Sequence, residues 1–151
     1  MVLARSGVDY ALHAYDHDPR SGRYGEEAVA ALGVAPERVF KTLIASVDRR
    51  LVVGIVPVPA TLDVKALAVV LGGKRGALAD PAEAERVTGY VLGGISPLGQ
   101  RRALTTVLDL CAADHDTIFI SGGRRGVEIE LAPAHLLQLT DGALAAISSA
   151  R

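Results

Sequence analysis

Residues 40–58, with the sequence FKTLIASVDRRLVVGIVPV, contain two apolar segments separated by a short polar turn. Each segment has the length and the β-branched content of a strand, and Asp48 to Arg50 are acceptable turn residues. The pattern therefore predicts an antiparallel hairpin near the middle of the sequence. A hairpin at this place interrupts any strict alternation of strands and helices, so it favours a mixed sheet over a Rossmann arrangement.

Helices are predicted where start and stop signals enclose an apolar face. Residues 26–33 have acids in the first turn and a final glycine, residues 80–89 begin with Asp-Pro, and residues 61–72 have Thr61 or Asp63 as the cap. A final helix is predicted after Pro133. Further strands are predicted over residues 8–15, 74–79, 105–112, 116–121 and 127–131. Together these elements predict one α/β domain over residues 1–151.

The composition excludes several classes of protein. Half of the residues are hydrophobic, aromatics make up 4%, and the net charge is −1. The core is therefore expected to be aliphatic, and a general positive coat for nucleic acid is excluded. Cys111 is the one cysteine, so no internal disulfide can form. Neither a signal-peptide pattern nor an apolar run of membrane-spanning length is evident, and we expect a cytoplasmic protein.

The stretch GYVLGGISPLGQRR, residues 89–102, resembles at first the Gly-x-Ser-x-Gly elbow of serine hydrolases. Here the second glycine comes one residue late, and Pro97 removes the backbone N–H that follows Ser96. Ser96 is therefore not predicted to be a nucleophile. A backbone role fits better: the N–H groups of Gly93, Gly94 and Ile95 can face a carbonyl or its oxyanion. A tight connection without a ligand is the alternative.

Lys41 is the second candidate. In a strand of period two, its face also carries Leu43, Ala45 and Val47, so the lysine starts the more apolar face. Its side chain either extends to the rim of the sheet or points into a pocket. In a pocket, the ammonium group can bind a phosphate or a carboxylate.

Other polar groups give weaker signals. Cys111 and His115 have helical ligand spacing without further ligands, so no metal site is predicted. The run HAYDHD, residues 13–18, is interpreted as a polar loop. The basic pairs 74–75, 101–102 and 124–125 are solvated unless folding brings them together, in which case they can contact phosphates.

These features and their neighbours resemble the YbaK/EbsC family of bacterial Cys-tRNA(Pro)/Cys-tRNA(Cys) deacylases. The resemblance covers nearly the whole chain, in the order and at the spacing of the family. It is carried by the segments YDHDP (15–19), YGEEA (24–28), FKTL (40–43), LDVKALA (62–68), TGYVLGGISPLGQRR (88–102) and ISGGRRGVEIELAP (120–133). Relatives usually have a fuller N-terminal helix; here residues 1–8 precede the matching run, so either that helix is shortened or the start is misassigned.

The resemblance implies a single domain with a mixed, strongly curved, barrel-like sheet flanked by helices. It also implies a trans-editing enzyme without a cofactor, which removes cysteine from mischarged tRNA(Pro) and acts with prolyl-tRNA synthetase. DNA and membranes are not expected partners. Two alternatives stay open: a deacylase for Ala-tRNA(Pro) or another aminoacyl-tRNA, and a non-catalytic module that binds tRNA ends, nucleotides or the synthetase.

The resemblance also implies the site. Lys41 matches the family's essential lysine near the terminal ribose or phosphate, and the loop from Gly93 to Pro97 is expected to hold the aminoacyl carbonyl through its backbone. The attacking group is then the thiol of the substrate, which expels the tRNA as a cyclic thiolactone. The positions that match the substrate pocket are Tyr15, Tyr24, Thr42, Ser121 and Glu128.

Overall fold

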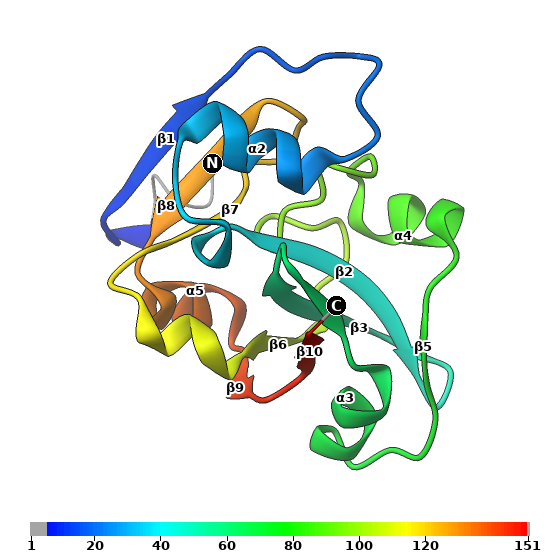
Figure 1. Cartoon of the computed structure of the whole chain (residues 1–151). Coiled ribbons are helices and arrows are strands. Elements are labelled where there is room, and N and C mark those ends of the chain that lie inside the picture. Colours follow the sequence, from blue (N-terminus) through cyan, green and yellow to red (C-terminus); the bar gives the residue numbers. More distant parts are fainter. Residues whose placement is uncertain (1–5, 151) are drawn as a thin grey trace.

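A five-stranded mixed sheet forms the centre of the computed structural model, which describes residues 6–150 (Figure 1). Its strand order is β5-β2-β3-β6-β9, with β2 antiparallel to both β5 and β3, and β6 parallel to both β3 and β9. The strands are β2 (Phe40–Val47), β3 (Arg50–Pro57), β5 (Gly76–Leu78), β6 (Thr105–Asp109) and β9 (Ala143–Ala145). The mixed sheet predicted from the hairpin is confirmed.

Two smaller antiparallel sheets complete the strands. One has the order β1-β8-β7, formed by β1 (Tyr10–Ala14), β8 (Val127–Leu131) and β7 (Ile118–Ser121). The other pairs β4 (Ala60–Leu62) with β10 (Ser148–Ala150). A single parallel bridge, Val39 to Phe119, connects the β1-β8-β7 sheet to the start of β2.

This separation differs from the expected barrel-like sheet. The 3-10 helix η1 (Pro36–Arg38) immediately precedes Val39, so the chain offers one extended residue to Phe119 before β2 begins its pairing with β3. A proline-led turn cannot extend a ladder, because proline lacks the N–H donor. The mixed α/β class is confirmed, whereas a continuous curled barrel is not seen in residues 6–150.

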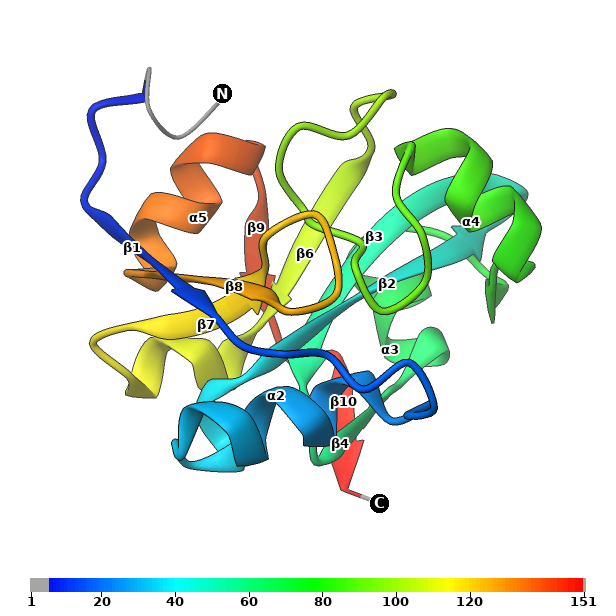
Figure 2. The same cartoon turned by 90° about the horizontal axis from the view of Figure 1, so that it is seen from above.

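The helices lie around the strands, at the periphery of the molecule (Figure 2). They are α2 (Tyr24–Leu32), α3 (Val64–Val70), α4 (Pro81–Thr88) and α5 (Pro133–Thr140), with a further 3-10 helix, η2 (Leu110–Asp114). Asp63 caps α3 by accepting from the N–H of Ala66, and Gly33 and Gly89 end α2 and α4 in the left-handed conformation. The helical segments were therefore predicted correctly, with Asp63 rather than Thr61 as the cap.

The hairpin turn is tighter than a generic polar loop. Asp48 and Arg49 have φ values of 49° and 70°, the pair of positive angles that a type I′ turn requires. The Asp48 carboxylate accepts hydrogen bonds from the backbone N–H groups of Lys74 and Arg75. These bonds hold the turn against the segment that leads into β5.

One predicted strand is wrong in extent, and one predicted helix is wrong in its place as the last element. The strand predicted over residues 105–112 ends at Asp109, because the Asp109 carboxylate accepts from the N–H of Cys111 and starts η2. The helix after Pro133 is not the last element, since β9 and β10 follow it. Both late strands are three residues long and pair with strands distant in the sequence.

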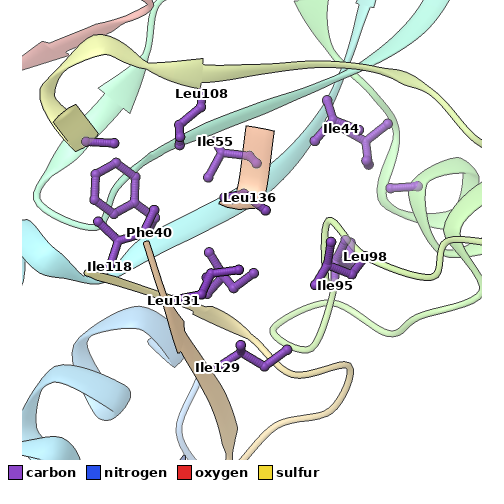
Figure 3. Close-up of a cluster of buried hydrophobic side chains, with 14 of the residues drawn as sticks. Phe40, Ile44, Ile55, Ile95, Leu98, Leu108, Ile118, Ile129, Leu131 and Leu136 are labelled. Carbon is purple, nitrogen blue, oxygen red and sulfur yellow. The ribbon is translucent and has the colours of Figure 1, made fainter. Parts of the chain in front are cut away.

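The largest core cluster lies between the central sheet, the β1-β8-β7 sheet and α5 (Figure 3). It is aliphatic, as predicted, apart from Phe40 among its buried members. On β8, Ile129 and Leu131 point into this cluster, while Glu128 and Glu130 occupy the opposite face. Figure 3 also shows Ile95 and Leu98 entering the cluster from the loop that follows α4.

The possible shortening of an N-terminal helix concerns residues that fall largely outside the described range. Within the described range, no helix is both long enough and apolar enough to cross a membrane.

Candidate active site

A cavity of about 670 Å³ lies between α2, β2, α4 and the loop that follows α4. It gathers residues from almost every block singled out in the sequence. The predicted site residues that line it are Tyr15, Tyr24, Lys41, Thr42, Gly93, Ile95, Ser121 and Glu128. The other three predicted residues, Gly94, Ser96 and Pro97, are buried beside it and do not line it.

Two features of the structure require a glycine at position 93. Its φ is +80°, a conformation that L residues rarely adopt, and a Cβ atom there would lie 2.4 Å from the Tyr24 ring. The Tyr24 ring is also covered by the Arg125 guanidinium, 4.4 Å from its centroid. Tyr24 therefore contacts both Gly93 and a cation, which fixes one wall of the cavity.

The peptide groups of the glycine loop differ in their availability. The N–H of Gly94 donates to the carbonyl of Val91 at 2.9 Å, so it closes a turn. Within residues 6–150, the N–H groups of Gly93 and Ile95 enter no such hydrogen bond, and both residues line the cavity. The donors that the loop can offer to a ligand are therefore Gly93 and Ile95, rather than the whole run.

Side chains on both sides hold this loop in place. The hydroxyl of Tyr90 donates to the carbonyl of Leu98, and the Gln100 amide donates to the carbonyl of Ser96 at 3.0 Å. Glu85 accepts from the N–H of Leu92 at 2.8 Å. Because each end is tied to its surroundings, the loop presents its free N–H groups in one arrangement, as an oxyanion site requires.

Ser96 has a structural part in the same loop. Its side chain is 2% exposed, and its hydroxyl accepts from the N–H of Leu98 at 3.2 Å. The hydroxyl stabilises the turn at Pro97 and does not line the cavity.

Lys41 and Thr42 enter the cavity from the start of β2. The Lys41 Nζ donates to the carbonyl of Val58 at 3.4 Å, so the ammonium lies at the cavity wall rather than beyond the sheet rim. The expected difference between the two faces of β2 is smaller than predicted, because Phe40 and Ile44 also enter a core. The Thr42 hydroxyl is buried and has no hydrogen-bond partner among the described residues. A bound ligand can supply that partner.

Glu128 is the buried acid of the cavity, whereas Glu26, which also lines it, is exposed. Glu128 is 6% exposed, and burial raises its pKa from the usual 4.5 to about 7. Ser121 lies directly opposite it on β7. Burial also raises the pKa of Tyr15, and the negative charges of Glu128 and Glu27 add to the effect. The cavity thus holds a carboxyl group that gains or loses a proton near neutral pH.

This acid makes the stability of the fold depend on pH. Between about 4.5 and about 7 the folded state keeps a proton that the unfolded chain has released, so stability present at low pH is lost as the pH rises. At ~1.4 kcal/mol per pKa unit, the loss reaches about 3 kcal/mol by pH 8. We expect Glu128→Gln to unfold at a higher temperature than the parent at pH 8, and at a similar temperature at pH 4.5. Thermal denaturation across this range checks it, with the exposed Glu37→Gln as control; parallel curves would contradict it.

Some residues of the site were missed in the sequence. Arg125 was noted as half of a basic pair, yet it covers Tyr24 and donates to the carbonyl of Leu92 at 2.8 Å. Glu27 bonds the His17 ring and the N–H of Asp18, which ties α2 to the HAYDHD segment. The glycines around residues 122–126 were the available signal for Arg125, but its contact with Tyr24 depends on the tertiary fold.

Cys111, which the sequence offered as a possible metal ligand, lies away from the cavity. Burial together with Asp109 raises the pKa of its thiol to about 12. Within the described residues, no group of three potential ligands is arranged to hold a metal ion.

Comparison with known families agrees with this geometry. Residues 21–139 match the model of the aminoacyl-tRNA editing domain. The chain belongs to this family. Editing is the hydrolytic removal of an amino acid from tRNA, so the chain is an enzyme of the aminoacyl-tRNA deacylase class. The matched residues include the cavity wall from Tyr24 to Glu128.

Relatives of this editing domain are found among bacterial proteins. The chain is 37% identical, over 82% of its length and 76% of the relative, to the Enterococcus faecalis protein named "Putative Cys-tRNA(Pro)/Cys-tRNA(Cys) deacylase EbsC". It is 26% identical, over 91% of its length and 83% of the relative, to the Escherichia coli "Multifunctional Ser/Thr-tRNA deacylase ProXp-y".

Solved structures show that the editing domain shares a known fold. The hypothetical protein APE2540 superposes with a TM-score of 0.86 over 97% of this chain and 96% of that one, at 24% identity. A second structure, of "a putative trans-editing enzyme for prolyl tRNA synthetase", superposes with a TM-score of 0.83 over 98% and 92%, also at 24% identity.

Proposed function

We propose that the chain removes cysteine from mischarged tRNA(Pro), and also accepts Cys-tRNA(Cys). The observation that carries the proposal is a cavity with a cation, free peptide donors and no activated nucleophile. Neither a histidine nor a cysteine is among the described residues that line it. Its hydroxyl groups come from Thr42, Ser121 and two tyrosines, and none of them hydrogen-bonds a histidine. A site of this kind suits a substrate that brings its own nucleophile.

The thiol of the cysteinyl group is that nucleophile. A free thiol with a pKa near ~8.5 is partly thiolate at neutral pH, and thiolates attack esters readily. The sulfur attacks its own ester carbonyl, the bond to the tRNA 3′ oxygen breaks, and that oxygen leaves and takes up a proton. The amino acid departs as a cyclic thiolactone. The protein has only to fold the aminoacyl group and stabilise the oxyanion.

Each wall of the cavity has a part in this scheme. The N–H groups of Gly93 and Ile95 bind the carbonyl oxygen as its charge develops. Lys41 binds the terminal ribose or phosphate and so sets the depth to which the aminoacyl group enters. Glu128, with Ser121 opposite, lies where it can accept from the α-amino group. Tyr24 packs on Gly93 and so positions the loop against α2.

The biological setting is trans-editing with prolyl-tRNA synthetase. Cysteine and proline are similar in size, and small differences in an apolar pocket give only ~1–3 kcal/mol of discrimination. A second hydrolytic site corrects the resulting errors. The net charge of −1 gives the protein no general attraction to tRNA. A complex with the synthetase would supply the choice of tRNA.

The experiment compares tRNA(Pro) charged with cysteine, alanine, serine or threonine. We expect Cys-tRNA(Pro) to be deacylated at least about tenfold faster than the seryl form, because the hydroxyl is a far weaker nucleophile. Thiolactone trapping by mass spectrometry checks the route. Ser96→Ala should leave the rate largely unchanged. Equal rates with all four amino acids would reject the thiol mechanism, and no turnover of any would reject the proposed function.

A further inference from the structure

A second cavity, of about 610 Å³, shares α4 with the candidate active site. Pro81 and Ala84 on this helix line the first cavity, whereas Glu83 and Arg86 line the second. At 3.6 residues per turn these pairs lie on opposite faces of the helix. The second cavity is therefore separated from the first by the thickness of one helix.

Four of the five charged residues that line this second cavity are arginines. These exposed arginines are Arg49 and Arg50 at the hairpin turn, Arg86 on α4, and Arg102 at the end of the glycine loop. We refer to these four residues as the arginine cleft. They come from three separate parts of the sequence, so only the fold brings them together.

Few negative charges oppose these arginines. Glu83 is the one acid that lines the cleft in the described range, and its carboxylate lies 3.6 Å from Arg86. Asp48 lies nearby, but its carboxylate already accepts from the N–H groups of Lys74 and Arg75. The local charge is thus positive in a chain whose net charge is −1. Guanidinium groups match the geometry of phosphate oxygens.

Two of the basic pairs noted in the sequence extend this surface. The Arg75 carbonyl accepts from the N–H of Asp48 at 2.9 Å, which places the 74–75 pair beside the hairpin turn. The N–H of Arg101 donates to the carbonyl of Thr88 at 2.9 Å, which places the 101–102 pair against the end of α4. The pair 124–125 lies apart, since Arg125 covers Tyr24 at the first cavity.

The distance from Lys41 to the second cavity fits a nucleic acid. The first cavity extends along β2 from Phe40 to Ile44 and the second includes Val47, so Lys41 is six residues, or about 20 Å along the strand, from Val47. Nucleotides that stack at ~3.4 Å each cover that distance in about six steps. Counting from the aminoacylated 3′ end of a tRNA, six steps pass the unpaired nucleotides and reach the first base pairs of the acceptor stem.

We propose that the arginine cleft binds phosphates of the tRNA acceptor arm while the aminoacyl end occupies the first cavity. This inference rests on the proposed function, since it takes the first cavity as the place of the aminoacyl group. The cleft then gives a nearly neutral protein its affinity for tRNA by local rather than overall charge. Because phosphates carry no sequence, it contributes affinity and orientation without choosing among tRNAs.

The test uses Arg50→Glu and Arg102→Glu, two exposed positions, singly and combined, and Lys65→Glu on the exposed side of α3 as the charge reversal that matches each single variant. Each protein is assayed with full Cys-tRNA and with cysteinyl-adenosine, which reaches only the first cavity. We expect the double variant to raise KM for Cys-tRNA at least about tenfold with little change in kcat, and to leave cysteinyl-adenosine unaffected. Each lost phosphate contact should also reduce the slope of log affinity against log salt by ~0.7–0.9.

The outcomes separate this inference from the proposed function. Binding of uncharged tRNA, followed by fluorescence anisotropy, should weaken in the double variant even if no deacylation is found with any protein. Unchanged KM, binding and salt slope for tRNA would overturn the inference while deacylation itself continues. An effect that appears only when prolyl-tRNA synthetase is added would also overturn it, because the cleft would then contact an acidic protein surface.

Discussion

Lys41→Ala is expected to lower kcat/KM for Cys-tRNA(Pro) by about 10² to 10³-fold, the range that follows the loss of a preorganised charged or oxyanion-binding group. The Lys41 ammonium lies at the cavity wall, donating to the carbonyl of Val58 at 3.4 Å. Arg23 is the other cation that lines the cavity in the described range, and it is exposed. No second group is therefore placed to replace Lys41.

The fold should tolerate this change. Lys41 is partly exposed, and the strand pairing of β2 uses its backbone. Steady-state kinetics should therefore show the loss while the thermal midpoint moves by only a few degrees. Lys65→Ala, which removes an exposed lysine from α3, is the matched control and should retain full activity. Lys41→Arg should rescue poorly, because a planar guanidinium is larger than the ammonium it replaces. Activity retained in Lys41→Ala would remove this residue from the site.

The central hairpin could be predicted because its information is local. Strand-length apolar segments and an Asp-Arg turn are adjacent in the sequence, so the residues of the hairpin themselves carry the signal. The strands β4, β9 and β10 gave no such signal. Each has three residues, and each pairs across a long stretch of sequence. Propensity over three residues cannot distinguish such strands from loops, so their existence depends on the tertiary fold.

The residues of the candidate site also divide into those with a local sequence signal and those without one. A lysine at the start of an apolar strand and a glycine run before Pro97 are unusual locally, and both proved to line or support one cavity. Tyr24 and Glu128 have no local peculiarity and were singled out only through a family resemblance. The choice of donors in the loop could not be predicted at all. It follows from the turn in which Gly94 donates to Val91, which leaves Gly93 and Ile95 facing the cavity.

The same packing makes Gly93 a sensitive position of the loop. Gly93→Ala is expected to lower kcat/KM by about a hundredfold, the cost associated with a displacement of ~1 Å at a reacting group. The new methyl group would lie 2.4 Å from the Tyr24 ring, so the ring or the loop must move. Positive φ adds about 1 kcal/mol of strain for a residue with a Cβ atom.

Gly89→Ala separates the two causes. Gly89 has nearly the same backbone angle, with φ of +81°, but a Cβ atom there would meet nothing closer than Arg101 at 3.6 Å. Both variants should lose similar stability from backbone strain, measured by thermal denaturation. Only Gly93→Ala should lose most of its deacylation rate. If both variants lose activity equally, strain in the loop rather than contact with Tyr24 controls the site. If neither does, the loop's N–H groups do not bind the reacting carbonyl, because its position would have changed without consequence.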